Sequence, residues 1–397
     1  MKFLIVSIAI ASVVLVAIIA VVLSLALTRK SKGSNFSWIP PPPDSEVDSE
    51  GSDFSPPPLR GPYVMTMTPT SDITTSSLPI SNMIDSTKVY YDIENATTGE
   101  SIVPAKSLVP EIGDIGDSEA YGLGVPTTEV SLMAGVPYRL TMYTNDTTGG
   151  LDLPAWNVYV ANIENDDTDI SSFGGFPFRK EGGNQFLGYK GFFSVGVDDT
   201  PFIRPETSLS KAFHRCANLP ASLENWNISN VTTLDFVFNN YRGTFDGIDL
   251  RKWDVSNVTN FHALFFQCTQ FNQDISNWDV SSGVTLPRMF DGAINFNQNL
   301  GSWKFGPNLT TLLRIFGQTP LLSTANYSAT LVGWAAHVAE TGSPPLEGGT
   351  VIMTNMYGGD APARTVTYDE SAVAARNFLI EKGWNIDGDI YVPSSSD

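Results

Sequence analysis

The chain has 397 residues, with 42 acidic and 23 basic side chains and a formal net charge of −19. This charge argues against nucleic-acid binding, which needs a basic patch, whereas 42% apolar and 11% aromatic residues suffice for a sizeable core. Two cysteines and three histidines exclude a disulfide-stapled scaffold and a four-cysteine zinc site, and argue against a histidine-rich metal centre.

The first segment of the chain is apolar, and no charged residue occurs from Phe3 to Leu27. Twenty-five helical residues would span roughly 37 Å, which exceeds a bilayer core of about 30 Å. We therefore expect residues 1–32 to be an uncleaved signal-anchor, through which the chain contacts the membrane. The alternative is a cleaved secretory signal, whose apolar region is usually about 7–15 residues long. Basic residues at 29, 30 and 32 slightly favour a cytoplasmic C-terminal side.

Residues 33–62 combine proline tracts with acidic side chains. Pro40–Pro43 and Pro56–Pro58 flank an acidic run at residues 44–53. Proline tracts hold a chain in the extended polyproline II conformation, and like charges extend it further. This composition predicts an extended stalk.

Residues 63–205 contain short segments rich in β-branched and aromatic residues, among them Lys88–Ile93, Tyr138–Tyr143 and Trp156–Val160. Turn-forming residues separate these segments. We expect one β-rich domain, a β-sandwich of the jelly-roll or immunoglobulin-like kind. The acidic cluster at residues 166–169 lacks the glycine and the distal glutamate of an EF-hand, so no metal site is predicted.

Residues 206–320 contain an internal repeat of about 25 residues, the strongest pattern in the chain. Trp-Asn/Asp-Ile/Val-Ser occurs at residues 226–229, 253–256 and 278–281, and a decayed copy occurs at 303–306. In each unit the residues around the tryptophan alternate as in a strand. Phe261, Leu264, Phe265 and Cys268 have the i, i+3, i+4, i+7 spacing of one face of a short helix.

A unit of this length falls in the range of leucine-rich repeats, which stack into a solenoid. Stacking would align equivalent side chains and form a buried ladder of four tryptophans: Trp226, Trp253, Trp278 and Trp303. Cys216 and Cys268 occupy equivalent positions two units apart, with Tyr241 between them, so we expect both to remain free thiols.

The segment Phe271–Ser281, Phe-Asn-Gln-Asp-Ile-Ser-Asn-Trp-Asp-Val-Ser, closely resembles the BspA-like leucine-rich-repeat surface proteins of bacteria, protists and some large viruses. Leu331–Trp334, Ala375–Leu379 and Lys382–Gly388 are similar to the C-terminal cap of that family, so residues 321–397 are interpreted as a cap. The resemblance covers residues 208–390. It implies a surface-exposed module for adhesion, with the bulk of the chain extracellular or on a virion surface.

Together these segments predict a mixed α/β protein: a single N-terminal transmembrane helix, a proline-rich stalk, a β-sandwich-like domain, and a short leucine-rich-repeat solenoid with a cap. The outward positions beside the tryptophans form a mixed polar face that suits a protein or glycan ligand. We take this face as the predicted binding surface: Asn225, Asn227, Lys252, Asp254, Asn277, Asp279, Ser302 and Lys304.

No catalytic motif accompanies His214, His262 or His337, and no phosphate-binding glycine-rich loop occurs. We therefore expect no enzyme, no catalytic residue, no metal and no cofactor. Two alternatives remain: a structural envelope or virion membrane protein without a specific ligand, and, less favoured, a hydrolase carried by residues 63–205.

Eight Asn-x-Ser/Thr sequons occur, four of which belong to the repeat itself. They give weak support for a secretory route. The other four are the candidate glycosylation sites: Asn35, Asn95, Asn145 and Asn326.

Overall fold

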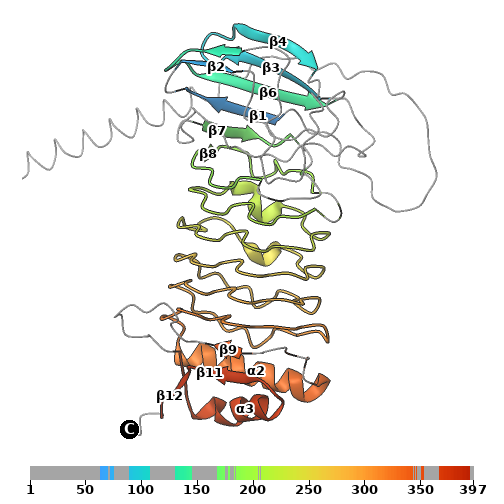
Figure 1. Cartoon of the computed structure of the whole chain (residues 1–397), viewed down its shortest axis with the longest axis vertical. Coiled ribbons are helices and arrows are strands. Elements are labelled where there is room, and N and C mark those ends of the chain that lie inside the picture. The colour runs from blue at the N-terminus through green and yellow to red at the C-terminus, as the bar shows by residue number, and fades with distance from the viewer. Residues whose placement is uncertain are drawn as a thin grey trace, which may run out of the picture. The chain divides into compact units, whose positions relative to one another are not determined.

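The structure is a computed structural model of the chain. It describes residues 63–69, 72–75, 89–107, 130–144, 168–174, 178, 183, 185–203, 205, 207–342, 344, 346, 350–352 and 366–393. These residues all belong to one unit, Ser55–Asp397. They form a sheet-rich, mixed α/β fold in which the described α-helices are α2 and α3 (Figure 1).

A six-stranded sheet forms the N-terminal described part, in the order β4-β3-β6-β1-β7-β8. Neighbouring strands run antiparallel except β7 and β8, which are parallel. Two further strands, β2 and β5, pair separately and antiparallel. The strand bounds are β1 Tyr63–Met67, β2 Ile73–Thr75, β3 Val89–Asn95, β4 Ser101–Ser107, β5 Val130–Leu132, β6 Tyr138–Thr144, β7 Thr168–Ser172 and β8 Phe192–Phe193.

The predicted β-sandwich is corrected by this topology, because the described strands form one six-stranded sheet and a separate two-stranded pair. Alternate residues of β1 are buried, as expected for a strand with one covered face. Their side chains join the same continuous core as those of the repeats, including Phe186 and Trp226. The sheet and the repeats thus share one hydrophobic core. The predicted strand Trp156–Val160 lies outside the described residues.

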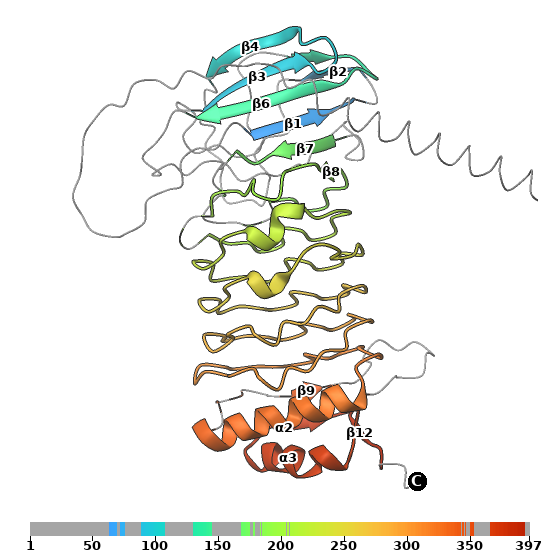
Figure 2. The ribbon, with the colours of Figure 1, turned by 180° about the vertical axis from the view of Figure 1, so that it is seen from behind.

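Beyond β8 the chain forms successive units that lie one above another, here called the repeat stack (residues 207–319; Figures 1 and 2). Isolated parallel bridges connect one residue of each unit to its equivalent in the next. The bridging residues are Ser208, Thr233, Asn260, Thr285 and Thr311.

The predicted leucine-rich-repeat solenoid, with a strand and a short helix in each unit, is wrong. The described residues of the repeat stack form neither a regular strand nor an α-helix, and carry two 3-10 helices, η3 (Ala221–Asn225) and η4 (Leu250–Lys252). Where a helix was expected, Ala263 and Gln267 have φ of 52° and 54°, in the left-handed region. An α-helix cannot contain such residues.

Hydrogen bonding explains this local conformation. An α-helical N–H group donates to the carbonyl four residues earlier. Instead, the N–H groups of Phe261, Ala263 and Phe265 donate to carbonyls of the next unit, at 2.9 Å each. The N–H groups of Leu264, Phe266 and Cys268 donate to the carbonyls three residues earlier, at 3.0 to 3.2 Å. The chain therefore forms consecutive turns that satisfy the backbone alternately within and between units.

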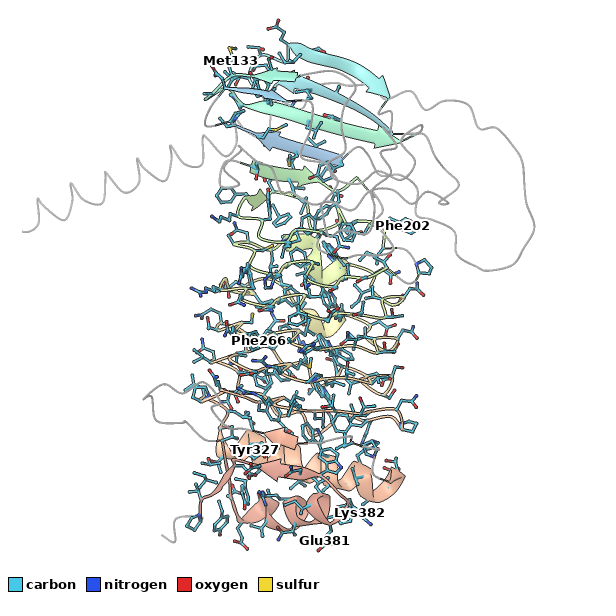
Figure 3. All side chains as sticks on the ribbon, in the orientation of Figure 1. Met133, Phe202, Phe266, Tyr327, Glu381 and Lys382 are labelled. Carbon is cyan, nitrogen blue, oxygen red and sulfur yellow. The ribbon has the colours of Figure 1, made fainter. Side chains whose placement is uncertain are left out.

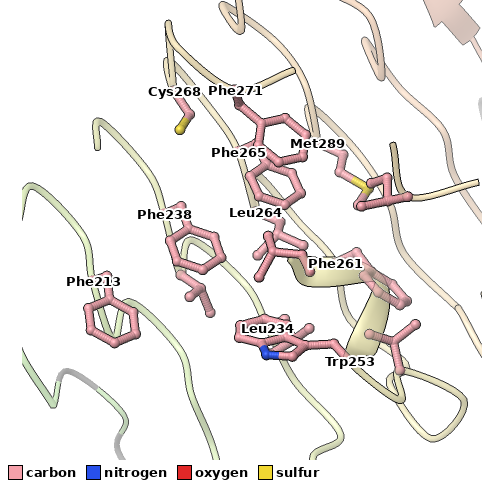
Figure 4. Close-up of a cluster of buried hydrophobic side chains, with 14 of the residues drawn as sticks. Phe213, Leu234, Phe238, Trp253, Phe261, Leu264, Phe265, Cys268, Phe271 and Met289 are labelled. Atoms are coloured by element: carbon pink, nitrogen blue, oxygen red, sulfur yellow. The ribbon is translucent and has the colours of Figure 1, made fainter. Parts of the chain in front are cut away.

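A ladder of phenylalanine rings fills the core of the repeat stack (Figure 4). It continues from Phe186 at one end to Trp334 of α2 at the other, at 5.2 and 5.9 Å from the nearest rung. Within the ladder, ring centroids lie 5.5 to 5.9 Å apart with interplanar angles of 5° to 14°. The rungs are Phe213, Phe238, Phe265, Phe290 and Phe316.

The tryptophans form a second buried column, and each is at most 3% exposed. The Nε1–H group of Trp253 donates to the Leu223 carbonyl in the preceding unit at 2.9 Å. Trp278 and Trp303 donate in the same way, at 2.9 and 3.0 Å. Each indole thus buries its ring and satisfies its polar N–H, as a buried tryptophan requires.

Helices α2 (Thr324–Thr341) and α3 (Glu370–Glu381) follow the last unit, with β9 Thr350–Ile352, β10 Thr367–Tyr368, β11 Asn385–Asp387 and β12 Ile390–Tyr391. Strand β9 pairs with β11 and β10 with β12, both in parallel. Trp334 of α2 donates its indole N–H to the Leu300 carbonyl at 2.9 Å. A Cβ on Gly333 would stand 2.1 Å from the Gly301 carbonyl oxygen, so only glycine permits this close approach.

The predicted single-pass membrane location is also corrected. Of the helices that the structure describes, none is long and apolar enough to cross a membrane. Helix α3 has only 12 residues, and the 18-residue α2 carries Asn, Ser, Thr and His side chains. The predicted anchor, Phe3–Leu27, and the predicted stalk, residues 33–62, lie outside the described residues.

The first prediction compares two adjacent phenylalanines. Phe265 is fully buried in the ladder, whereas Phe266 is half-buried at the surface. We expect Phe265→Ala to lower the free energy of unfolding by about 3–5 kcal/mol, because it empties a large core site. Phe266→Ala should cost about 1 kcal/mol or less. Urea unfolding of both variants measures the difference, and equal midpoints would contradict the ladder.

Candidate functional site

The eight residues of the sequence-predicted binding surface are all exposed, at equivalent positions beside the tryptophans of successive units. The residues that directly precede the tryptophans form hydrogen bonds or ion pairs with other residues of the chain. The amides of Asn225 and Asn277 donate to main-chain carbonyls of the preceding unit at 2.9 and 2.8 Å. Ser302 donates similarly at 2.5 Å, and Lys252 pairs with Glu224 at 2.5 Å.

The residues that follow the tryptophans cap local turns. Carboxylate or amide oxygens of Asn227, Asp254 and Asp279 accept from the N–H group two residues later, at 3.0 to 3.2 Å. This is an Asx-turn, in which the side chain replaces a backbone acceptor. Lys304 completes the row as an exposed residue. Most of the predicted surface therefore recurs because it stabilises the stack.

The repeated Phe-Asn-Gln motif also has an internal role. The Asn272 side-chain oxygen accepts from the Asn297 N–H of the next unit at 2.8 Å. Gln273 accepts from the Leu250 N–H at 3.1 Å and donates to the Phe245 carbonyl at 3.2 Å, both in the preceding unit. These polar side chains bind neighbouring units and so are not available to a ligand.

A different surface emerges on the turns that replace the expected helices. It comprises the residues two, three, six and seven positions after each bridging residue, and we call it the turn face. The buried positions between them repeat the same apolar types, whereas the turn face changes from unit to unit. Its exposed and half-buried aromatic and basic members are Lys211, His214, Arg215, Phe236, His262, Phe266 and Arg288.

The backbone of the turn face is unusual. In every unit, the residues three and seven positions after the bridging residue have positive φ. Lys211 and Phe236 both have φ of 56°, and Arg288 has 57°. Left-handed backbone costs a non-glycine residue about 1–2 kcal/mol. Gly292 occupies one equivalent position, so glycine is compatible with this backbone. Because the left-handed conformation recurs in every unit, it follows from the stacking of the units and not from the individual residues.

Aromatic and cationic side chains contact one another across four successive units. The ring centroids of Phe236 and His262 lie 4.6 Å apart in an edge-to-face arrangement. The Lys211 Nζ lies 5.9 Å from the Phe236 centroid, and the Arg288 guanidinium lies 4.4 Å from that of Phe266. Phe266 is labelled about midway along the repeat stack in Figure 3. The turn face therefore carries two groups of contacting side chains, Lys211 with Phe236 and His262, and Phe266 with Arg288.

The carboxylates of the turn face are already engaged. Asp235 accepts from the hydroxyl groups of Ser210 and Thr233, at 3.0 and 2.7 Å. Asp291 is 1% exposed and pairs with Arg288 and Arg314, at 3.0 and 3.2 Å. Lys211 and Arg215, in contrast, are exposed. In a chain with a net charge of −19, this surface presents cations to solvent.

Two of the three histidines lie on the turn face. Burial, reinforced by the charges of Arg215 and Lys211, lowers the pKa of His214 to about 4. Burial also lowers the pKa of His262, with Arg288 acting in the same direction and Asp235 opposing it. Both imidazoles are therefore neutral at pH 7.

The third histidine, His337, and the two cysteines are buried. Nε2 of His337 in α2 accepts from the Phe305 N–H at 3.0 Å. Cys216 and Cys268 are free and buried, and burial raises the pKa of both thiols. A protonated, inaccessible thiol is a poor nucleophile. Within the residues that the structure describes, no group of three His, Cys, Asp or Glu is placed to hold a metal ion.

The candidate glycosylation sites differ in environment. Asn95 is the last residue of β3, and its side-chain oxygen accepts from the N–H groups of Thr97 and Thr98 in the following turn at 2.9 and 3.0 Å. The Asn326 amide instead donates to the Asn297 carbonyl at 2.8 Å, at the base of α2. Asn35 and Asn145 lie outside the described residues.

Comparison with known families gives a match over the repeat stack. A family model described as "Mycoplasma protein of unknown function, DUF285" matches residues 207–327. This range begins just before the first bridging residue and ends in the first turns of α2. No curated protein and no solved structure matches the chain.

The second prediction concerns His214. The pKa of His214 falls from 6.5 to about 4 on folding. Between pH 4 and pH 6.5, the imidazole is therefore protonated in the unfolded chain but not in the folded chain. The His214 contribution to stability should therefore decrease as the pH falls from about 6.5 to about 4. NMR titration of the imidazole measures the pKa, and His214→Gln should reduce the loss of urea midpoint over this range. A titration near 6.5 would contradict the assignment.

Proposed function

We propose that the repeat stack is a BspA-like binding module that recognises a protein or a glycan, the kind of contact such proteins use in adhesion. Two observations support this proposal. The segment Phe271–Ser281 resembles those proteins closely, and the matched family range covers the repeat stack. The observation that carries it is the turn face, where the half-buried rings of Phe236 and Phe266 lie on the same surface as the exposed cations Lys211 and Arg215.

Aromatic residues and arginine are enriched at the centres of protein interfaces. On the turn face, Phe236, Phe266 and Arg288 are also held by contacts with one another and with Lys211 and His262. Side chains that are already ordered lose less conformational entropy on binding. The turn face thus combines suitable chemistry with a fixed arrangement.

A scaffold without a ligand is the competing function. The hydrogen bonds between units favour it, since they account for most of the polar residues beside the tryptophans. They do not account for the presence of aromatic rings at Phe236 and Phe266, which are half-buried at the surface. A scaffold would tolerate polar residues at both positions.

The third prediction tests the binding function directly. The intact chain is applied to arrays of glycans and of surface proteins, and ligands are confirmed by titration. The double variant Phe236→Ser, Phe266→Ser should weaken binding at least about tenfold, because interface aromatics carry much of the binding energy. Lys304→Gln, an exposed change beside the tryptophans, is the matched control and should bind normally.

Thermal unfolding must show that the double variant remains folded. If the wild-type chain binds nothing, the proposed function fails and the scaffold stands; if the double variant binds every ligand as well as the control does, the turn face is not the binding site.

A further inference from the structure

We propose that Asp169, Phe192 and Ser194, here called the β7–β8 patch, bind the guanidinium group of an arginine side chain in a partner protein. The inference goes beyond the proposed function, because this patch lies on the sheet and not on the turn face. Two observations coincide there and carry it: a carboxylate that has no cationic partner among the described residues, and an exposed aromatic ring beside it.

The register of β7 and β8 places the carboxylate and the ring side by side. The two strands are parallel neighbours, and Asp169 lies directly opposite Phe192 (Figure 1). Both neighbours of Asp169 in β7 are fully buried, so its side chain points to the other face of the sheet. Phe193 packs in the core, with its ring 5.2 Å from that of Phe186, so Phe192 points away from the core. Asp169 and Phe192 therefore project from the same face of two hydrogen-bonded strands.

The Asp169 carboxylate is held in place but keeps acceptor capacity. Its Oδ1 atom accepts from the Ser194 N–H group at 3.0 Å, and its Oδ2 atom accepts from the Ser194 hydroxyl group at 2.7 Å. Each carboxylate oxygen can accept about two hydrogen bonds, so each retains one acceptor position. Within the described residues no ion pair includes Asp169, because Arg139 on the same face of the sheet pairs with Glu94 at 2.5 Å.

The Phe192 ring is accessible, with 60% of the residue exposed. Its backbone is fixed by pairing with β7 and by the Tyr189 hydroxyl group, which donates to the Phe192 carbonyl at 3.0 Å. An aromatic ring attracts a cation over its face. A planar guanidinium group can stack on such a ring and also donate two parallel hydrogen bonds to a carboxylate, which a lysine ammonium group cannot do. The β7–β8 patch therefore suits arginine better than lysine.

Charge complementarity and the open surface favour a basic protein as the partner. The chain has a net charge of −19, which attracts a basic partner over a long range. Sites for small molecules usually enclose most of the ligand surface. A ring that is 60% exposed gives no such enclosure, whereas an arginine carried by a protein gains further contacts from its neighbours. Lys190, two residues before Phe192, is exposed and is the like charge that an incoming arginine meets.

The test uses the intact chain labelled with ¹³C-phenylalanine, in which the Phe192 ring signals are assigned by their loss in Phe192→Leu. The probe is the peptide Gly-Ser-Arg-Ser-Gly, blocked at both ends. The Phe192 signals should shift with a saturable, millimolar Kd that weakens as salt rises. The same peptide with citrulline, which has the shape of arginine without its charge, should bind at least about fivefold more weakly. Free arginine should bind no more tightly than the blocked peptide.

Matched protein variants locate the contact. Asp169→Asn should weaken binding about three- to fivefold, the effect of losing one exposed ion pair. Asp254→Asn is the control, because it removes the same charge from an exposed turn whose equivalent in another unit is Asn227, and it should leave the Kd unchanged. Lys190→Gln should bind at least as tightly as the parent chain. Thermal unfolding shows whether Asp169→Asn is folded, and saturation transfer to the arginine side chain, measured for Phe192→Leu, should fall at least about threefold.

Four results would overturn the inference: the Phe192 signals do not respond to the arginine peptide at millimolar concentration, the citrulline peptide binds equally well, Asp169→Asn and Asp254→Asn have equal effects, or a neutral disaccharide shifts the Phe192 signals and the arginine peptide does not. Tighter binding of free arginine than of the peptide would indicate a small-molecule site and would also reject the protein partner. These outcomes are separable from those of the proposed function, because they are read at Phe192, whereas the array test depends on Phe236 and Phe266.

Discussion

Along the turns of the repeat stack, alternate main-chain N–H groups donate to carbonyls of the next unit, and the rest of the stack depends on this alternation. The remaining N–H groups close turns within the unit, three residues back. To alternate in this way, the chain must enter the left-handed region at two positions per unit, which it does in every unit from Lys211 to Gln318. The backbone is thereby satisfied without regular strands or helices.

This backbone determines where the side chains go. Four positions of each unit point inward, and the phenylalanines among them stack into a ladder with ring centroids 5.5 to 5.9 Å apart. The four positions between them form the turn face, where many of the side chains are exposed or half-buried. Because the inward set carries the packing energy, the outward set is free to vary from unit to unit, and Lys211, Phe236 and Arg288 differ at equivalent positions.

The polar residues of the stack also fall into two groups, those that bond to neighbouring units and those that are exposed to solvent. Asn272, Gln273 and Asn277 bond to neighbouring units, so their recurrence follows from stacking. Lys211 and Arg215 are not needed for stacking, and they present positive charge on a strongly acidic chain. The repeated polar residues therefore have structural roles, and the candidate site consists of residues that differ from unit to unit.

The spacing of apolar residues by itself determined which side chains are buried. Phe261, Leu264, Phe265 and Cys268 are all buried, although they lie on turns and not on a helix. The spacing i, i+3, i+4, i+7 describes the inward side of either conformation, so periodicity could not distinguish them. The periodic tryptophans likewise indicated a buried column, and the residues beside them are exposed.

Only the tertiary structure decided the backbone conformation of the stack and the composition of the turn face. Each depends on hydrogen bonds to a unit about 25 residues away, such as that from Phe265 to Met289. A local pattern carries no information on these partners. Left-handed backbone at Phe236 or Arg288 also contradicts the preference of those residue types, so it follows from the stack and not from the residues that adopt it.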